Sequence, residues 1–285
     1  MRFGFLLFLG LTAPAWLWSQ TTPALNGGDL CHEVTGEGPP LLLIGGLGNR
    51  MSVWDDLLPK LTAHHRVIRF DPAGLGCSSA HQPAGTVADL ARHAATLLDH
   101  LNIRRCQVAG ISLGGFVAQS MALQFPERVD KLVLMGSSIG GKAHVVPDQE
   151  VLQFFATSAT LPREAAVRKG YVLALRPDFE ADHPKRHGEL VAREAAYQPP
   201  PTTVQKHAMA GFFFDQSAVV QNIAVPTLVL HGALDRVVPV ANGRKLGEAI
   251  PNAKTVVLPK AGHLCIIDSV EATAAAILAF TAPTF

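Results

Sequence analysis

Short apolar segments alternate along this chain with longer segments of helical periodicity, and that alternation limits the folds open to it. Several of the short segments are unbroken runs of Val, Ile and Leu, which is typical of strands buried on both faces of a parallel sheet. The predicted strands are 30–34, 41–44, 67–70, 106–109, 132–135, 227–230 and 255–258. The helical segments among them are 52–62, 86–101, 112–124, 240–250 and 270–280. The pattern predicts an α/β fold with a mostly parallel central sheet and helices on both faces.

One long segment interrupts the alternation and predicts a second structural unit. Residues 139–215 contain no clear strand, and their helical patterns, 148–157, 163–175, 185–197 and 203–214, are parted by proline-containing joints. A segment of this length is too long for a loop. We therefore expect a helical cap at 139–215 on a core formed by 21–138 and 216–285. The cap should lie over the carboxyl ends of the strands, where open α/β sheets bind ligands.

The composition excludes several functional classes. Apolar residues make up 48% of the 285-residue chain and charged residues 16%, which excludes a disordered protein. The 24 Lys and Arg almost balance the 23 Asp and Glu, and no long block of one charge occurs, so we expect no nucleic-acid partner. Neither H-E-x-x-H nor C-x-x-C spacing is present, so we expect no metal site.

The amino terminus has the order of a secretory signal. Arg2 precedes an apolar run at 3–18, and the first acidic residue is Asp29. The run is shorter than the roughly 20 residues of a membrane-spanning helix, so we expect no stable membrane span. The pattern predicts a signal peptide at 1–20 and a periplasmic or secreted protein. The alternative is a cytoplasmic protein with an amphipathic amino-terminal extension.

The four cysteines leave the disulfide pattern open. They are Cys31, Cys77, Cys106 and Cys265, and an oxidising compartment would permit pairs among them. Cys31 and Cys106 lie in apolar strand-like runs, where a free cysteine usually acts as a small buried apolar residue. Cys77 and Cys265 lie near the motifs described next, where a pair between them is one alternative to inert packing.

A G-x-S-x-G sequence lies where a predicted strand turns into a predicted helix. Gly110 and Gly114 flank Ser112, directly after the strand at 106–109. A sharp strand-to-helix turn brings the flanking backbones so close that no Cβ fits, which explains the two glycines. Ser112 would then be exposed at the positive end of a helix, as a nucleophile for acyl transfer.

The base and the acid that such a serine needs follow two other strands. Asp235 comes after the strand at 227–230, and His263 after the strand at 255–258. Because the carboxyl ends of parallel strands meet at one edge, we expect Ser112, Asp235 and His263 to form a catalytic triad there. Most other histidines, among them His65 and His207, are expected at the surface.

The remaining site predictions concern the oxyanion and the substrate. The backbone N–H groups of Leu113 and Leu47 are the predicted oxyanion donors, Leu47 because it lies in the glycine-rich loop after the strand at 41–44. Gly46 in that loop would let the substrate approach the backbone. Phe212 and Phe213 of the cap are predicted to wall an apolar acyl site.

These motifs together resemble the α/β-hydrolase superfamily with a helical cap, over nearly all of the chain after Asp29. The segment 71–78 is similar to the family's D-x-R-G-x-G-x-S turn, and 125–129 leads into a strand as in the family. Two positions depart from its pattern. Gly45 stands where many members have His, and Ala73 replaces the usual Arg.

The resemblance implies a serine hydrolase that cleaves a carboxylic ester or lactone through an acyl-enzyme and needs no cofactor. The apolar early loop and the 136–147 segment look like those of polyhydroxyalkanoate depolymerases, enol-lactonases and broad, lipase-like carboxylesterases. Two alternatives stay open: a cofactor-independent perhydrolase or haloperoxidase of the same fold, and a ligand-binding or signalling protein on this scaffold. The acyl-chain preference and the oligomeric state are open as well.

Overall fold

The computed structural model describes residues 19–23, 29–79 and 82–282, so the predicted signal peptide at 1–20 falls almost wholly outside it. One eight-stranded sheet forms the centre of the described chain, in the order β1-β2-β4-β3-β5-β6-β7-β8. The strands are β1 Ser19–Pro23, β2 Asp29–Thr35, β3 Pro40–Ile44, β4 Arg66–Phe70, β5 Cys106–Ile111, β6 Val129–Met135, β7 Thr227–Gly232 and β8 Ala253–Leu258. All seven predicted strands are confirmed, whereas β1, which includes the last two residues of the predicted signal peptide, was not predicted.

The sheet is mostly parallel, as predicted. Strands β4, β3, β5, β6, β7 and β8 run parallel, and only β2 and β1 are antiparallel to their neighbours. The chain order reverses between β3 and β5, because the strand after β3 lies on its other side. In an open α/β sheet, ligands bind at such a reversal, outside the carboxyl ends of the strands.

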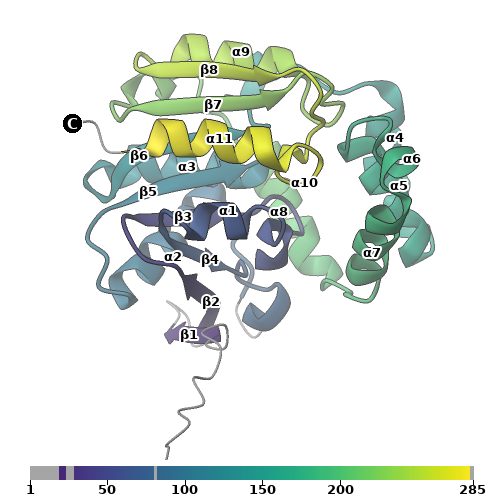
Figure 1. The fold of residues 1–285 in the computed structure, drawn as a ribbon, viewed down its shortest axis with the longest axis horizontal. Helices are drawn as coiled ribbons and strands as arrows, with labels where there is room; N and C mark the ends of the chain where they lie inside the picture. The colour runs from purple at the N-terminus through teal and green to yellow at the C-terminus, as the bar shows by residue number, and fades with distance from the viewer. Residues whose placement is uncertain (1–18, 24–28, 80–81, 283–285) are drawn as a thin grey trace, which may run out of the picture.

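Two hydrophobic clusters hold helices on the two faces of the sheet (Figure 1). The first cluster contains residues of α2, α3 and α9, and the second contains residues of α1, α10 and α11. These helices are α1 Leu58–Thr62, α2 Val87–His100, α3 Leu113–Gln124, α9 Val240–Ala249, α10 Cys265–Asp268 and α11 Val270–Thr281. The helix predicted at 52–62 is shorter than expected, because a 3₁₀ turn at Met51–Trp54 precedes α1.

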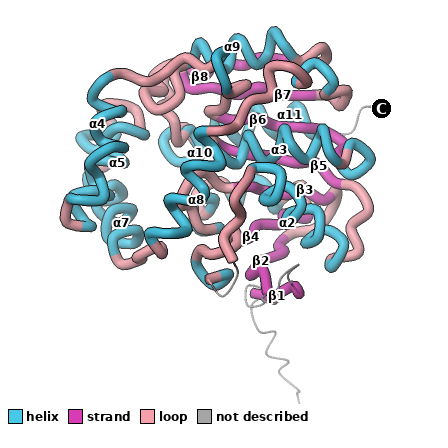
Figure 2. Tube along the Cα trace, turned by 180° about the vertical axis from the view of Figure 1, so that it is seen from behind, coloured by secondary structure: helices cyan, strands magenta, loops and turns pink. Residues whose placement is uncertain are grey.

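The chain between β6 and β7 contains helices and no strand of the sheet. These helices are α4 Gln149–Thr157, α5 Arg163–Ala174, α6 Phe179–Asp182, α7 Pro184–Ala195 and α8 Pro201–Phe212. The figures show α4 to α7 as a group beside the sheet, whereas α8 lies against the core (Figures 1 and 2). Gly140 and Asp215 form an isolated antiparallel bridge, so the two ends of the insertion lie side by side.

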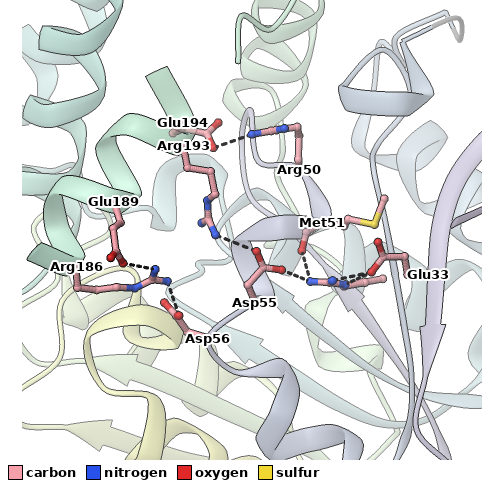
Figure 3. Close-up of polar contacts among 10 residues, drawn as sticks. Glu33, Arg50, Met51, Asp55, Asp56, Arg186, Glu189, Arg193 and Glu194 are labelled. Carbon is pink, nitrogen blue, oxygen red and sulfur yellow. Dashed lines mark hydrogen bonds and ion pairs between the residues drawn. The ribbon is translucent and has the colours of Figure 1, made fainter. Parts of the chain in front are cut away.

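Ion pairs join α7 to the segment that follows β3 (Figure 3). We call them the cap–core seam: Arg50 with Glu194, Asp55 with Arg193, and Asp56 with Arg186. Asp55 also accepts from Arg69, which is buried and paired with Glu33. The segment after β3 therefore carries both the glycine-rich loop and the anchor for α7.

The structure resolves the pairing of the cysteines. Cys31 of β2 and Cys77 form a disulfide with Cα atoms 5.5 Å apart, while Cys106 and Cys265 are free and buried. Of the alternatives that the sequence left open, the structure excludes a free Cys31 and a pair between Cys77 and Cys265. The turn at 71–78 folds back onto β2, where the Ser78 hydroxyl accepts the N–H of Cys31 at 2.8 Å.

Candidate active site

Ser112 lies at a strained turn between β5 and α3. Its φ is +55°, in a region that side chains other than glycine rarely adopt. The turn is close-packed as predicted: a Cβ at Gly110 would lie 2.1 Å from the carbonyl oxygen of Gly114, and one at Gly114 would lie 2.1 Å from that of Ile44. The Ser112 N–H donates to the carbonyl of Met135 at 2.8 Å, so the strained residue is fixed to the neighbouring strand.

Asp235 and His263 form a buried hydrogen-bonded pair. His263 Nδ1 donates to Asp235 Oδ2 at 2.8 Å, and the other carboxylate oxygen accepts the N–H groups of Val237 at 2.9 Å and Val238 at 2.7 Å. Burial by itself raises the pKa of Asp235, but His263 and His231 beside it outweigh that effect and hold it at about 2. The carboxylate is therefore anionic and fixed in place at neutral pH.

The structure brings the three predicted triad residues to one edge of the sheet. Ser112 and His263 line the same cavity, and Asp235 lies behind the His263 ring. Because Nδ1 of His263 is held by Asp235, Nε2 is the nitrogen left for a proton from Ser112. Gly136, with a φ of +50°, makes room for this pair, since a Cβ there would lie 3.0 Å from Nδ1.

The two predicted oxyanion donors belong to the segments on either side of Ser112, the start of α3 and the glycine-rich loop after β3. Leu113 is the first residue of α3, so its N–H has no acceptor within the helix. Leu47 lines the cavity in the loop after β3. Gly46 approaches the nucleophile so closely that a Cβ would lie 3.1 Å from Ser112 Cβ, and its N–H is already used by Asn49 Oδ1 at 3.1 Å. The Gly46 N–H is therefore not free for a substrate, which leaves the predicted Leu47 N–H as a candidate donor from this loop.

A cavity of about 350 Å³ separates these groups from the helical insertion. Its floor is formed by Gly46, Leu47, Ser112 and His263 of the core. Its walls are mostly apolar side chains of the insertion: Val151, Phe154, Phe155, Val167, Tyr171, Leu173 and Val204. Arg163, Glu194 and Ser158 add a polar part to the lining. The arrangement can enclose an apolar acyl group next to the serine.

Phe212 and Phe213 do not wall the cavity, contrary to the prediction. They are 78% and 72% exposed at the end of α8 and contribute nothing to its lining. Successive helical residues are separated by about 100° around the axis, so Phe212 faces away from the buried Ala210 two positions earlier. The inward-facing aromatic is Phe214, which stacks on Phe116 of α3 at 4.2 Å between ring centroids.

His207 of α8 is buried, although it was expected at the surface. It is 1% exposed and lies in a small pocket behind the glycine-rich loop, with Gly45, Ala73 and Leu113 in the lining. Gly45 and Ala73 are the two positions that depart from the family pattern. Both residues are small, and the side chain of His207 lies in the space beside them. Desolvation lowers the pKa of His207 to about 4, so it is neutral at neutral pH. His65 is also buried, at 3% exposure, and not solvated as expected.

Across residues 19–23, 29–79 and 82–282, no three His, Cys, Asp or Glu side chains come together in a way that could hold a metal ion. The helices in these ranges include none with the length and apolar character of a membrane span.

Comparison with known proteins agrees with this geometry. The model of the α/β hydrolase fold family matches residues 39–270, so the chain belongs to that family and is a hydrolase. It is 31% identical over 240 residues to a protein of Stutzerimonas stutzeri (strain A1501) whose name proposes a carbamate hydrolase, RutD, with 82% of this chain and 88% of that protein covered. It is 31% identical to the poly(3-hydroxyalkanoate) depolymerase of Ectopseudomonas oleovorans, covering 85% and 83% of the two chains. The crystal structure of the enol-lactonase from Burkholderia xenovorans LB400 superposes with a TM-score of 0.77 at 25% identity, over 90% of this chain and 97% of that one.

Proposed function

We propose that this protein hydrolyses a carboxylic ester or lactone through an acyl-enzyme formed on Ser112. The observation that carries the proposal is the shared cavity: Ser112 and His263 both line it, and His263 is hydrogen-bonded to the buried anion of Asp235. A serine hydroxyl is inert unless a base takes its proton and a third group orients that base, and these residues supply both.

The proposed reaction has two halves. Ser112 Oγ attacks the carbonyl carbon while His263 Nε2 takes its proton, and the N–H groups of Leu47 and Leu113 bind the oxyanion. His263 returns the proton to the leaving alkoxide, which departs and leaves the acyl-enzyme. Water then attacks the acyl carbonyl with His263 again as base, and the acid is released as Ser112 recovers its proton. Asp235 stays ionised throughout and stabilises the imidazolium that forms twice.

The cavity and the relatives both support an apolar substrate with an ester-type bond. Walls of Phe, Val, Leu and Tyr side chains suit an apolar acyl group, and about 350 Å³ suits a small molecule. The names of the similar proteins include a polyester depolymerase and an enol-lactonase, which both refer to ester-type bonds. A carbamate carbonyl, suggested by the name of another relative, would meet the same nucleophile and the same two donors.

We also propose that the protein is exported. The signal-like order at residues 1–20 is one support, and the disulfide between Cys31 and Cys77 is the other, because disulfides persist in the periplasm and outside the cell. Detection of the protein in periplasmic or medium fractions, shortened by loss of the amino-terminal segment, would support this. Protein retained in the cytoplasm at full length would contradict it.

Covalent labelling with a fluorophosphonate tests the activated serine without knowledge of the substrate. Wild type should be labelled at Ser112, as located by peptide mass mapping, and Ser112→Ala should not be labelled. Ser158→Ala is the matched control, because Ser158 lines the same cavity and should leave the labelling unchanged. Folded wild-type protein that takes up no label would overturn the triad and favour a binding protein on this scaffold.

A further inference from the structure

A second histidine, His231 of β7, contacts the carboxylate of the proposed triad. Its Nε2 lies 3.2 Å from Asp235 Oδ2, the same oxygen that His263 Nδ1 approaches at 2.8 Å. The side chains of both His231 and Asp235 are 0% exposed. Two imidazole rings therefore share one oxygen of a fully buried carboxylate.

The surroundings of His231 define its tautomer. Nε2 lies 2.7 Å from the carbonyl oxygen of Val238, which can only accept a hydrogen bond, so Nε2 carries a hydrogen. Asp235 Oδ2, at 3.2 Å from the same nitrogen, is the second acceptor within reach of that N–H. The other nitrogen, Nδ1, lies against the backbone of α9, where a Cβ at Gly243 would come within 2.3 Å of it.

The two imidazole rings differ in their surroundings. Within the described residues Nδ1 of His231 is fully buried without a hydrogen-bond partner. His263 instead lines the cavity, where it takes and returns a proton in the proposed reaction. His231 is thus placed to contact Asp235 without taking part in the proton transfer.

We propose that His231 is a positioning residue for the proposed hydrolysis, a buried donor that fixes Asp235 Oδ2 and weakens the attraction of this carboxylate for His263. Oδ1 of Asp235 already accepts two backbone N–H groups, so His231 completes a set of two donors on each oxygen. A hydrogen bond donated to an anion spreads the negative charge of the anion and weakens the attraction between the anion and a neighbouring cation. Without His231 the carboxylate should hold protonated His263 more strongly and be less firmly oriented. This role rests on the proposed function, since it concerns the same triad.

The other groups around this carboxylate cannot take over the role. The Cys265 thiol of α10 is buried, which raises its pKa to about 12 and keeps it neutral. Asp268 of α10 lies behind Gly262 and accepts its N–H at 2.8 Å. Arg236 is next to Asp235 in sequence, but its guanidinium is partly exposed and paired with Asp148 and Glu150. From α9, the backbone at Gly243 lies against the His231 ring.

The test compares His231→Leu and His231→Gln in the pH dependence of kcat/KM for a short aryl ester. In His231→Leu the acid limb should move up by about 0.5 to 1 pH unit, because the less dispersed anion favours the protonated base. Its kcat at the optimum should fall roughly tenfold with KM nearly unchanged, since substrate does not touch this residue. His231→Gln keeps an N–H that can reach Oδ2 and should restore both the limb and most of kcat.

A matched variant separates positioning from packing. His65→Leu removes another buried imidazole, outside the site, and should lower the melting temperature without moving the acid limb. The proposal is overturned if His231→Leu loses stability while its acid limb stays in place, or if His231→Gln fails to rescue a displaced limb. The pH dependence of fluorophosphonate labelling gives the same readout without an ester substrate. Failure of Ser112 to label in wild type would instead refute the proposed function.

Discussion

The disulfide between Cys31 and Cys77 should make a large, measurable contribution to stability. Its cysteines are 46 residues apart, and a cross-link that closes a loop of that length removes about 13 cal/mol/K of entropy from the unfolded chain. This corresponds to about 4 kcal/mol at 25 °C. With an unfolding entropy near 0.6 kcal/mol/K for a chain of 285 residues, the loss should lower Tm by about 7 °C.

Urea and thermal unfolding of Cys77→Ser, with and without dithiothreitol, test this estimate. Cys77 is exposed, so the substitution leaves no cavity, and Ser79→Ala is the control for a change at an exposed neighbour. Reductant should bring wild type to the level of Cys77→Ser and leave that variant unchanged. Cys106 and Cys265 will not interfere, because burial raises the pKa of each thiol to about 12. A Cys77→Ser protein within about 0.5 kcal/mol of oxidised wild type would refute the reasoning.

Three further predictions concern the packing around the site. The folded pKa of His207 is about 4, below its unfolded value, so the contribution of this residue to stability is complete above pH 6.5 and is lost as the pH falls towards 4. His207→Leu should remove this pH dependence, on the order of 3 kcal/mol, when the free energy of unfolding is measured against pH. An unchanged slope in the variant would contradict the prediction. Gly136→Ala should lower kcat at least about tenfold in a protein with unchanged circular dichroism, because its Cβ meets the ring of His263, and full activity would be evidence against this contact. Alanine variants at Arg186 and Asp56 of the cap–core seam should show a coupling free energy of about 0.3–1 kcal/mol in a double-mutant cycle of stability. Salt at 1 M should reduce this coupling. Zero coupling at low salt would contradict the ion pair.

The central strands could be predicted from the sequence, and so could the carboxyl ends at which the site residues lie, because both depend on local patterns. Strands buried on both faces consist mainly of Val, Ile and Leu, and the runs at 41–44 before the glycine-rich loop and at 228–230 before Asp235 show this clearly. The glycines around Ser112 report a steric constraint of the turn itself. β1 carries no such signal, since Ser19–Pro23 is short and polar.

Features that depend on contacts between distant segments could not be predicted. The three phenylalanines at 212–214 have the same chemistry, and only the docking of α8 decides that Phe214 is buried while Phe212 is exposed. His207 is polar and was expected at the surface, but the small residues Gly45 and Ala73 leave a pocket for it. The partner of Cys31 depends on how the turn at 71–78 folds back onto β2. His231 lies four residues before Asp235 in the sequence, but their contact could not be predicted from that spacing.

The most direct test of the central claim is the hydrolysis of aryl esters of increasing acyl length by wild type and by Ser112→Ala. Wild type should hydrolyse the series with an optimum set by the cavity, and Ser112→Ala should lose several orders of magnitude in kcat, on the order of the 10⁶ found for triad nucleophiles. Ester turnover retained by folded Ser112→Ala, or absent from folded wild type across the whole series, would contradict hydrolysis through Ser112.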